Sequence, residues 1–158
     1  MTRIPLTVAG ARKLREELNR LKKVERPRAI EALAEARGHG DVQENPDYAN
    51  VKQQQEFIER RIRALEEKVA NAQIIDPSRI DAGGRVVFGA TVELYEPQTG
   101  KEVSYQIVGE DEADINEGLV SINSPLARAL IGAEEGDEVA VQAPGGTRTY
   151  EIKRIRYE

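Results

Sequence analysis

The sequence predicts an α+β protein: an N-terminal antiparallel helical hairpin (a coiled coil) followed by a small antiparallel-sheet domain. Three observations lead to this prediction. Apolar residues recur at helical spacing in 11–37 and 47–72, they alternate in short β-branched segments further on, and turn-forming residues separate those segments. Helices followed by strands are typical of an α+β fold. We expect residues 1–75 to form the hairpin and residues 80–158 the sheet domain.

The helical rhythm is clearest in residues 47–72. Its inward positions are spaced by four and three residues in turn, and they are Val51, Gln55, Ile58, Ile62, Leu65, Val69 and Ala72. This heptad spacing is typical of the packed face of a coiled coil. A helix of about 26 residues would be roughly 40 Å long, at about 1.5 Å per residue. Two such helices paired with each other would make a projecting rod.

The earlier stretch, 11–37, keeps the same rhythm with one interruption. Its apolar positions are Ala11, Leu14, Leu18 and Leu21, and then Ile30, Leu33 and Ala34. Pro27 stands between the two groups. Proline removes a backbone donor and clashes with the preceding turn, so we expect a kink or short break there. Glu16–Arg20 and Glu59–Arg63 are candidate ion pairs at i,i+4 spacing along the helices.

The segment between the helices is short enough to require an antiparallel turn. Gly38 and Gly40 suit the left-handed conformation that ends many helices. Asn45 is a good N-cap for the second helix, and Pro46 is pre-set for its first position. Asp47 would favour the positive end of the helix dipole.

The second half of the chain predicts strands. The candidate strands are residues 85–88, 90–95, 103–108, 119–122, 138–142 and 149–155. Turn formers such as Gly136-Asp137 and Pro144-Gly145-Gly146 separate them. One short helix fits residues 125–131, with Ser124 as its cap.

Composition limits the classes of function. The chain of 158 residues is 32% charged and has no cysteine, which excludes disulfides, thiol catalysis and Cys-ligated metal sites. Its first residues lack the apolar run of a signal peptide, and no stretch approaches the roughly 20 apolar residues of a membrane span. We therefore expect a cytoplasmic protein with no membrane partner.

The net charge of −5 is unevenly spread. Residues 1–75 hold 15 Lys and Arg against 12 Asp and Glu, whereas residues 76–158 hold 8 against 16. The overall charge argues against binding free duplex DNA by bulk electrostatics. The asymmetry indicates that the two halves face different partners.

The candidate chemistry lies in the turn between the helices. The single histidine, His39, cannot form a metal site alone, but Asp41, Glu44 and Asp47 bring three carboxylates within seven residues. Carboxylates are hard oxygen ligands suited to Mg²⁺ or Mn²⁺, and a set this small would complete a site shared with another molecule. A polar turn whose acids favour the helix dipole explains the same residues, and spacing alone leaves both interpretations open.

Basic residues along both helices are interleaved with acidic ones, as expected of a solvated face. Lys52 stands nearest the turn and is the best candidate for a phosphate contact.

Several runs of residues resemble one family. The run ARGHGDVQENPDYANVKQQQEFIERRI resembles the tip and second helix of the bacterial GreA-type transcript cleavage factors. The runs RVVFGATVEL, YQIVGEDEAD and VSINSPLARALIGAEEGDEVAV, followed by PGG, resemble the C-terminal domain of the same family. The resemblance covers essentially the whole chain, in order.

The resemblance implies a coiled coil joined to an FKBP-like domain that docks on RNA polymerase. The tip would enter the secondary channel, where Asp41 and Glu44 match the two carboxylates that assist the catalytic Mg²⁺ of the polymerase and its water. Asn45, Asp47 and Tyr48 match positions that support the tip.

Further expectations follow from the same resemblance. Lys52 matches a basic position that contacts the 3′ segment of the nascent RNA. The chain would be a monomer and no enzyme itself. It would have no cofactor of its own and would share Mg²⁺ with the polymerase, whose active site would cut backtracked RNA. The neutral glutamines after Lys52 favour the GreA type over the more basic GreB type.

Two other functions stay open at this point. A protein of the same shape could block the channel and inhibit transcription, although the matching tip residues argue against this. Alternatively, the FKBP-like domain could serve a non-polymerase adaptor or chaperone. Prolyl isomerase activity is not expected, because likeness of fold does not carry function and aromatics are only 4% of the chain.

Overall fold

The computed structural model describes residues 3–38 and 46–158. Its described residues form two compact units. One contains residues 11–38 and 46–72, and the other contains residues 3–10 and 73–158.

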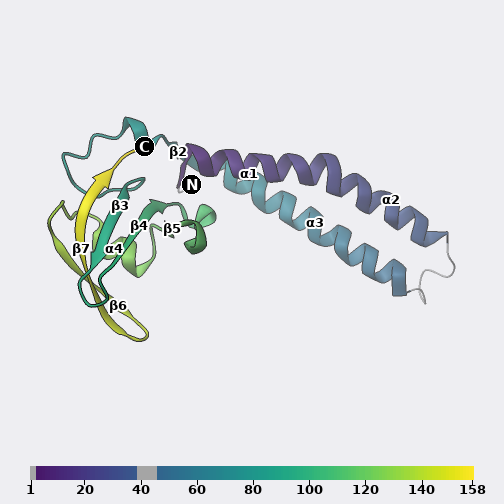
Figure 1. Ribbon diagram of the computed structural model, residues 1–158. Coiled ribbons are helices and arrows are strands. Elements are labelled where there is room, and N and C mark those ends of the chain that lie inside the picture. The colour runs from purple at the N-terminus through teal and green to yellow at the C-terminus, as the bar shows by residue number, and fades with distance from the viewer. Residues whose placement is uncertain (1–2, 39–45) are drawn as a thin grey trace. The chain divides into compact units, whose positions relative to one another are not determined.

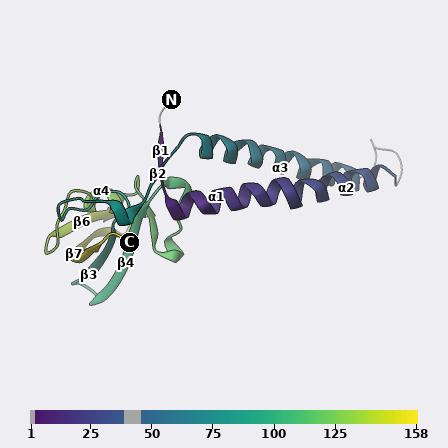
Figure 2. The same cartoon turned by 90° about the horizontal axis from the view of Figure 1, so that it is seen from above.

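The first unit is a helical hairpin, as the sequence predicted. Its first arm consists of α1 (Val8–Arg20), a π-helical turn η1 (Leu21–Glu25) and α2 (Arg26–Arg37), and its second arm is α3 (Pro46–Ala70). The arms run side by side in opposite directions in both views (Figure 1, Figure 2). The heptad residues of α3 face inward: Ile58, Ile62 and Leu65 are buried, and Val51, Gln55 and Val69 are half-buried. Ala72, predicted to continue this helix, instead begins a strand, because α3 ends at Ala70. Ala29, Leu18 and Leu21 of the first arm pack with Ile58 and Ile62.

The interruption predicted at Pro27 is a π-helical turn rather than a break. The backbone N–H of Arg26 donates to the carbonyl of Leu21, five residues earlier, and Pro27 follows directly with no N–H to donate. A π turn holds one extra residue, so the inward face shifts by one position after it. Ala29 and Ala36 are buried, whereas Ile30 is 50% exposed and Ala34 is exposed. The prediction that Ile30 and Ala34 face inward was therefore wrong.

The helix ends beside the tip agree only in part with the sequence prediction. Pro46 opens α3 and Asp47 lies in its first turn, as predicted. Gly38 caps α2 with φ of −75°, so it is right-handed and not left-handed. Its N–H donates to the carbonyl of Glu35, a tight bond that continues the helical turn. Gly40 and Asn45 lie outside the described residues.

The second unit contains a five-stranded sheet in the order β5-β4-β3-β7-β6. Its strands are β3 (Thr91–Glu96), β4 (Lys101–Val108), β5 (Leu119–Ser121), β6 (Glu138–Ala143) and β7 (Gly146–Arg156). The pairs are antiparallel, as predicted, except that β5 runs parallel to β4. Two stretches differ from the prediction: residues 85–88 contribute only an isolated bridge, and β1 (Ile4–Thr7) pairs with β2 (Ala72–Ile75) in a separate sheet.

One face of this sheet forms the core. Burial alternates along β3, where Val92 and Leu94 are at most 1% exposed. The short helix α4 (Pro125–Leu130) covers that face with Ala127 and Leu130, and the hydroxyl of Ser124 caps it by accepting from the N–H of Ala127. Short 3-10 turns, η2 (Pro77–Arg79), η3 (Glu110–Glu112) and η4 (Ile115–Glu117), complete the connections. Within residues 3–38 and 46–158, no helix is long and apolar enough to cross a bilayer.

Candidate functional site

The candidate site is the end of the hairpin, where α2 stops and α3 begins. Of the predicted site residues, the structure describes Asp47, Tyr48 and Lys52, all on the first two turns of α3. Asp41, Glu44 and Asn45 lie outside the described residues, in the linker that joins Gly38 to Pro46. Because α2 and α3 are antiparallel, the two ends of this linker are held at the same end of the hairpin.

Tyr48 lies between the two helices at this end. It is only 9% exposed, and the guanidinium of Arg37 lies over its ring, 5.8 Å from the centroid. The Nη2 atom of Arg37 is also 3.5 Å from the Tyr48 hydroxyl, a long polar contact. A cation over an aromatic ring stabilises an exposed site by roughly 0.5–1 kcal/mol. The contact joins the last residue of α2 to the first turn of α3, on either side of the linker.

The inward place of Tyr48 was present in the sequence but not recognised there. Tyr48, Val51 and Gln55 are separated by three and then four residues, so Tyr48 continues the heptad by one step toward the tip. The stacking of Arg37 has no such signal, because a basic residue at a helix end is ordinarily explained by the dipole.

Asp47 and Lys52 are exposed on α3. Asp47 occupies the first turn, where the positive end of the helix dipole favours a carboxylate. Lys52 is four residues after Tyr48, about one turn further along the helix, and its side chain is exposed whereas that of Tyr48 is buried. All three residues lie in the first two turns of α3, and Asp47 and Lys52 are the exposed ones.

Of these three side chains, only the carboxylate of Asp47 is an oxygen ligand suited to Mg²⁺. Among the described residues, no group of three His, Cys, Asp or Glu side chains could hold a metal ion by itself. Mg²⁺ requires about six oxygen ligands and keeps several waters. Tip carboxylates fit Mg²⁺ in kind, and most of its ligands would have to come from water or another molecule.

Ion pairs between the helices fix the arms behind the tip. The Nε and Nη2 atoms of Arg26 donate to the two carboxylate oxygens of Glu59 at 2.7 and 2.8 Å. Arg61 and Glu17 form a second two-pronged pair with both distances at 3.0 Å. The hydrogen bond from Arg26 holds the pKa of Glu59 below its usual range, and the same bond raises the pKa of Arg26.

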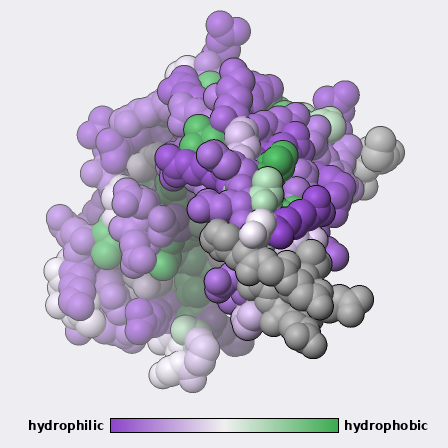
Figure 3. Space-filling model, turned by 90° about the vertical axis from the view of Figure 1, so that its right-hand side faces the viewer, coloured by the Kyte–Doolittle hydropathy of each residue, from purple (hydrophilic) through white to green (hydrophobic). Residues whose placement is uncertain are grey.

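The predicted pairs along each helix are replaced by other pairs. Arg20 pairs with Glu25 at 3.4 Å rather than with Glu16. Glu59 bonds to Arg26 of the facing helix, and the charge of Arg63 only adds to the lowering of its pKa. Figure 3, which views the molecule from the end of the hairpin, shows a mostly hydrophilic surface with few apolar patches.

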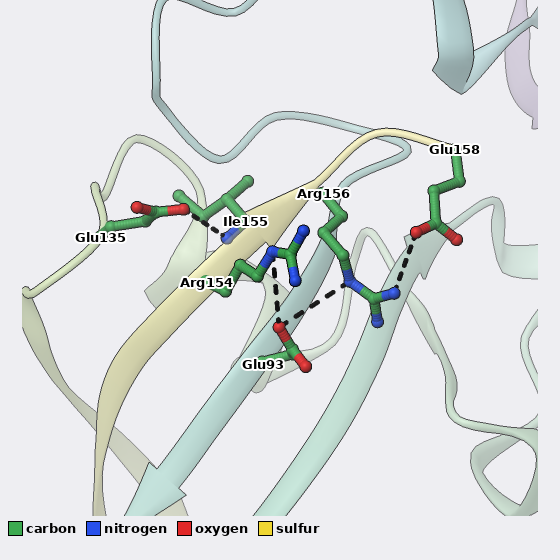
Figure 4. Close-up of polar contacts among 6 residues, drawn as sticks. All are labelled: Glu93, Glu135, Arg154, Ile155, Arg156 and Glu158. Atoms are coloured by element: carbon green, nitrogen blue, oxygen red, sulfur yellow. Dashed lines mark hydrogen bonds and ion pairs between the residues drawn. The ribbon is translucent and has the colours of Figure 1, made fainter.

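The sheet unit offers no comparable site in what the structure describes. Pro144 and Gly145 form the turn of the β6–β7 hairpin, as predicted, with Ala143 paired to Gly146. The charged groups at the end of β7 neutralise one another (Figure 4). There Glu93 lies 4.0 Å from Arg154 and 3.8 Å from Arg156, and Arg156 also contacts Glu158 at 2.9 Å.

Comparison with known proteins gives consistent results over the whole chain. The family model described as "Transcription elongation factor, N-terminal" matches residues 4–74, and "Transcription elongation factor, GreA/GreB, C-term" matches residues 81–157. The chain is 64% identical over 157 residues to the transcription elongation factor GreA of Alkalilimnicola ehrlichii, covering 99% of both chains. It is 62% identical to the GreA of Halorhodospira halophila, covering both chains completely. Among solved structures, GreA factor homolog 1 of Thermus thermophilus is 29% identical, with 98% of this chain and 99% of that chain covered and a TM-score of 0.43.

Proposed function

Because the chain belongs to the GreA/GreB family of transcription elongation factors, and within it resembles GreA as the sequence predicted, we propose that it stimulates cleavage of backtracked nascent RNA by RNA polymerase. As a member of this family, the chain is a transcription elongation factor that acts on RNA polymerase. The proposal adds that the hairpin enters the secondary channel and that the active site of the polymerase cuts the RNA. The cleavage would rescue arrested complexes.

One observation carries this proposal. Two antiparallel helices hold both ends of a carboxylate-bearing linker at one end of a hairpin, and α3 alone has 25 residues. At about 1.5 Å per residue this helix is roughly 37 Å long, enough to carry the linker deep into a narrow channel.

In the proposed mechanism, Asp41 and Glu44 complete a metal site that belongs mainly to the polymerase. A second Mg²⁺ held there would activate water for attack on the RNA phosphodiester. The chain itself supplies carboxylate oxygens and holds them in place. It is not an enzyme alone, and it has no cofactor of its own.

The neighbouring residues would support these carboxylates. Asn45 would cap α3, and Asp47 would add negative charge beside the metal. Tyr48, stacked under Arg37, would fix the direction in which the linker leaves α3. Lys52, one turn further along α3, would contact a phosphate near the 3′ end of the nascent RNA. The protein would act as a monomer in the cytoplasm.

The test uses stalled, backtracked elongation complexes with Mg²⁺. Asp41→Asn and Glu44→Gln keep size and remove charge, and each should lower the cleavage rate at saturating factor by about 10²–10³-fold, the usual effect of removing one group that stabilises developing charge. Affinity for core polymerase should stay unchanged. Glu31→Gln, on the exposed surface of α2, is the matched control and should cleave normally. Normal cleavage by both tip variants would refute the proposal.

A further inference from the structure

A hollow with a volume of about 490 Å³ lies at the surface of the sheet unit. Three segments that are far apart in the sequence form its wall. They are residues 80–84, which follow η2, residues 134–135, which precede β6, and Ile155 and Tyr157 at and just beyond the end of β7. All of them belong to one compact unit, so the shape of the hollow is set within that unit.

Hydrogen bonds hold these segments together. Arg85, directly after the first segment, forms a β-bridge with Glu134, and its carbonyl accepts from the Tyr157 hydroxyl at 2.5 Å. The carboxylate of Glu135 accepts from the backbone N–H of Ile155 at 2.9 Å (Figure 4). The wall is therefore formed before any partner binds, as is usual for binding sites in proteins.

Apolar groups form one part of the wall. They belong to Ile80, Ala82, Ile155 and Tyr157. Ile155 and Tyr157 also pack against the core of the sheet unit, so packing as well as hydrogen bonding fixes their positions. The hollow thus offers a fixed apolar surface to the part of a partner that enters it.

Carboxylates form another part of the wall. Asp81, Glu134 and Glu135 contribute three of them, and no lysine or arginine is among the described residues that line the hollow. Arg85 lies beside it, but the Nε atom of Arg85 is 3.7 Å from Glu134 and both side chains are more than half exposed. An exposed pair at this distance is weak, so the hollow keeps a net negative charge.

This combination of groups fits the side chain of a lysine or an arginine. Such a side chain has an aliphatic stem, which would contact the apolar part of the wall, and a cationic head, which would pair with the carboxylates. The charge of the surrounding unit also favours a basic partner, because residues 76–158 hold 8 Lys and Arg against 16 Asp and Glu. The same charge would repel a nucleic acid.

We propose that the hollow is a docking site for a basic segment of RNA polymerase, which inserts a lysine or arginine side chain and pairs it with the carboxylates of Asp81 and Glu134. RNA polymerase is the partner on which factors of this family act. The inference rests on that partnership and not on the proposed cleavage of RNA. It assigns the docking contact to one hollow rather than to the acidic surface as a whole.

Affinity for core polymerase, measured without RNA, tests the role of the charges. Asp81→Asn combined with Glu134→Gln keeps the size of both side chains and removes two charges. The Kd should rise by about tenfold at low salt, the effect of losing two exposed ion pairs, and the rise should shrink as salt screens the pairs. Glu102→Gln combined with Glu117→Gln is the matched control, because it removes two charges from exposed positions of the same unit. An unchanged Kd in the first double variant, or an equal rise in both, overturns the proposal.

Filling the hollow tests its shape without a change of charge. Ala82→Phe places a ring in the space that the side chain of the partner would occupy, so it should also weaken binding, and this loss should persist at high salt. Ala140→Phe adds the same ring at an exposed position of β6 and should bind normally. Thermal unfolding establishes which variants are folded, and the two amide substitutions carry the test if Ala82→Phe is not. Normal binding by a folded Ala82→Phe overturns the proposal.

A second copy of the chain is the other basic candidate, because residues 1–75 hold 15 Lys and Arg against 12 Asp and Glu. Analytical ultracentrifugation of the protein alone separates the two occupants. A dimer in the parent that is lost in the Asp81→Asn, Glu134→Gln variant would assign the hollow to a second copy and overturn the proposal. A monomer in both, together with the loss of affinity for polymerase, supports it. The proposed cleavage function fails separately, because the tip variants report on the cleavage rate and these variants report on affinity.

Discussion

The helical hairpin and the sheet unit are stabilised in different ways. The sheet unit has a core in which residues from β3, β4, β7 and α4 meet, and Leu94, Ile107, Leu130 and Ile152 are each at most 1% exposed. The hairpin has a narrow apolar stripe, in which Ile62 and Leu65 are at most 1% exposed while Ala29 and Ile58 are 8% and 7% exposed. Ion pairs at the surface of the hairpin contribute further stability, and exposed pairs are each worth at most about 1 kcal/mol.

This difference suits different tasks. A layered core gives a rigid unit. Two paired helices cannot bury both of their faces, but they hold the two ends of a short linker at one end of the hairpin. The stability of the hairpin therefore depends on the register between its two arms more than on the total area that it buries. A few contacts between the arms set this register. Three substitutions test this contrast.

The largest effect is expected in the sheet core. Leu94→Ala should lower the free energy of unfolding of the sheet unit by about 3–5 kcal/mol, because β3 and its neighbours cannot collapse around the cavity. Urea unfolding followed by amide hydrogen exchange measures this unit separately from the hairpin. Thr147→Ala, at an exposed position of β7, is the control and should change the value by no more than about 0.5 kcal/mol.

A smaller effect is expected in the hairpin. Ile62→Ala should lower the free energy of unfolding of the hairpin by about 2–3 kcal/mol. This value is at the low end for a buried aliphatic residue, because the two helices can move together and close the cavity. The same exchange experiment, read on amides of α2 and α3, gives the value. A loss equal to that of Leu94→Ala would show that the hairpin is as tightly packed as the sheet, and the contrast would fail.

The sequence predicted the fold correctly where burial of one face makes apolar residues recur at regular spacing. The alternation in residues 90–95 identified β3 because one face of that strand is buried, and the heptad identified α3 for the same reason. β1 was missed, since four residues that pair with a strand about 65 positions later leave no local pattern. The parallel pairing of β5 was also missed, because its direction depends on the path of the chain through η3 and η4.

Other parts of the chain show the same limit. Pro27 indicated an interruption, but the apolar pattern did not reveal the extra residue of the π turn, after which Ile30 is exposed. Glu112 lies in the acidic run GEDEAD, which resembles a solvated loop. One of the three hydrogen-bond donors to its carboxylate is the N–H of Gly109, three residues earlier, but the other two belong to Thr7, which only the folded chain brings to it. The roles of Asp41 and Glu44 remain predictions that the cleavage assay decides.

The smallest effect, and the one that reports on register, is expected at Glu59. Its pKa is lowered in the folded protein by the hydrogen bond from Arg26, so the carboxylate stabilises the hairpin above its unfolded pKa, and this contribution disappears as pH falls through the lower folded pKa. Glu59→Gln should therefore be less stable than the parent near neutral pH, and the difference should shrink on acidification below about pH 4. Urea unfolding of both proteins across this range measures it. Arg26→Ala removes the cause of the shift, so in that background the pH dependence of the Glu59→Gln difference should be weaker. A difference that is constant with pH would show that the pair does not hold the two helices in register in solution.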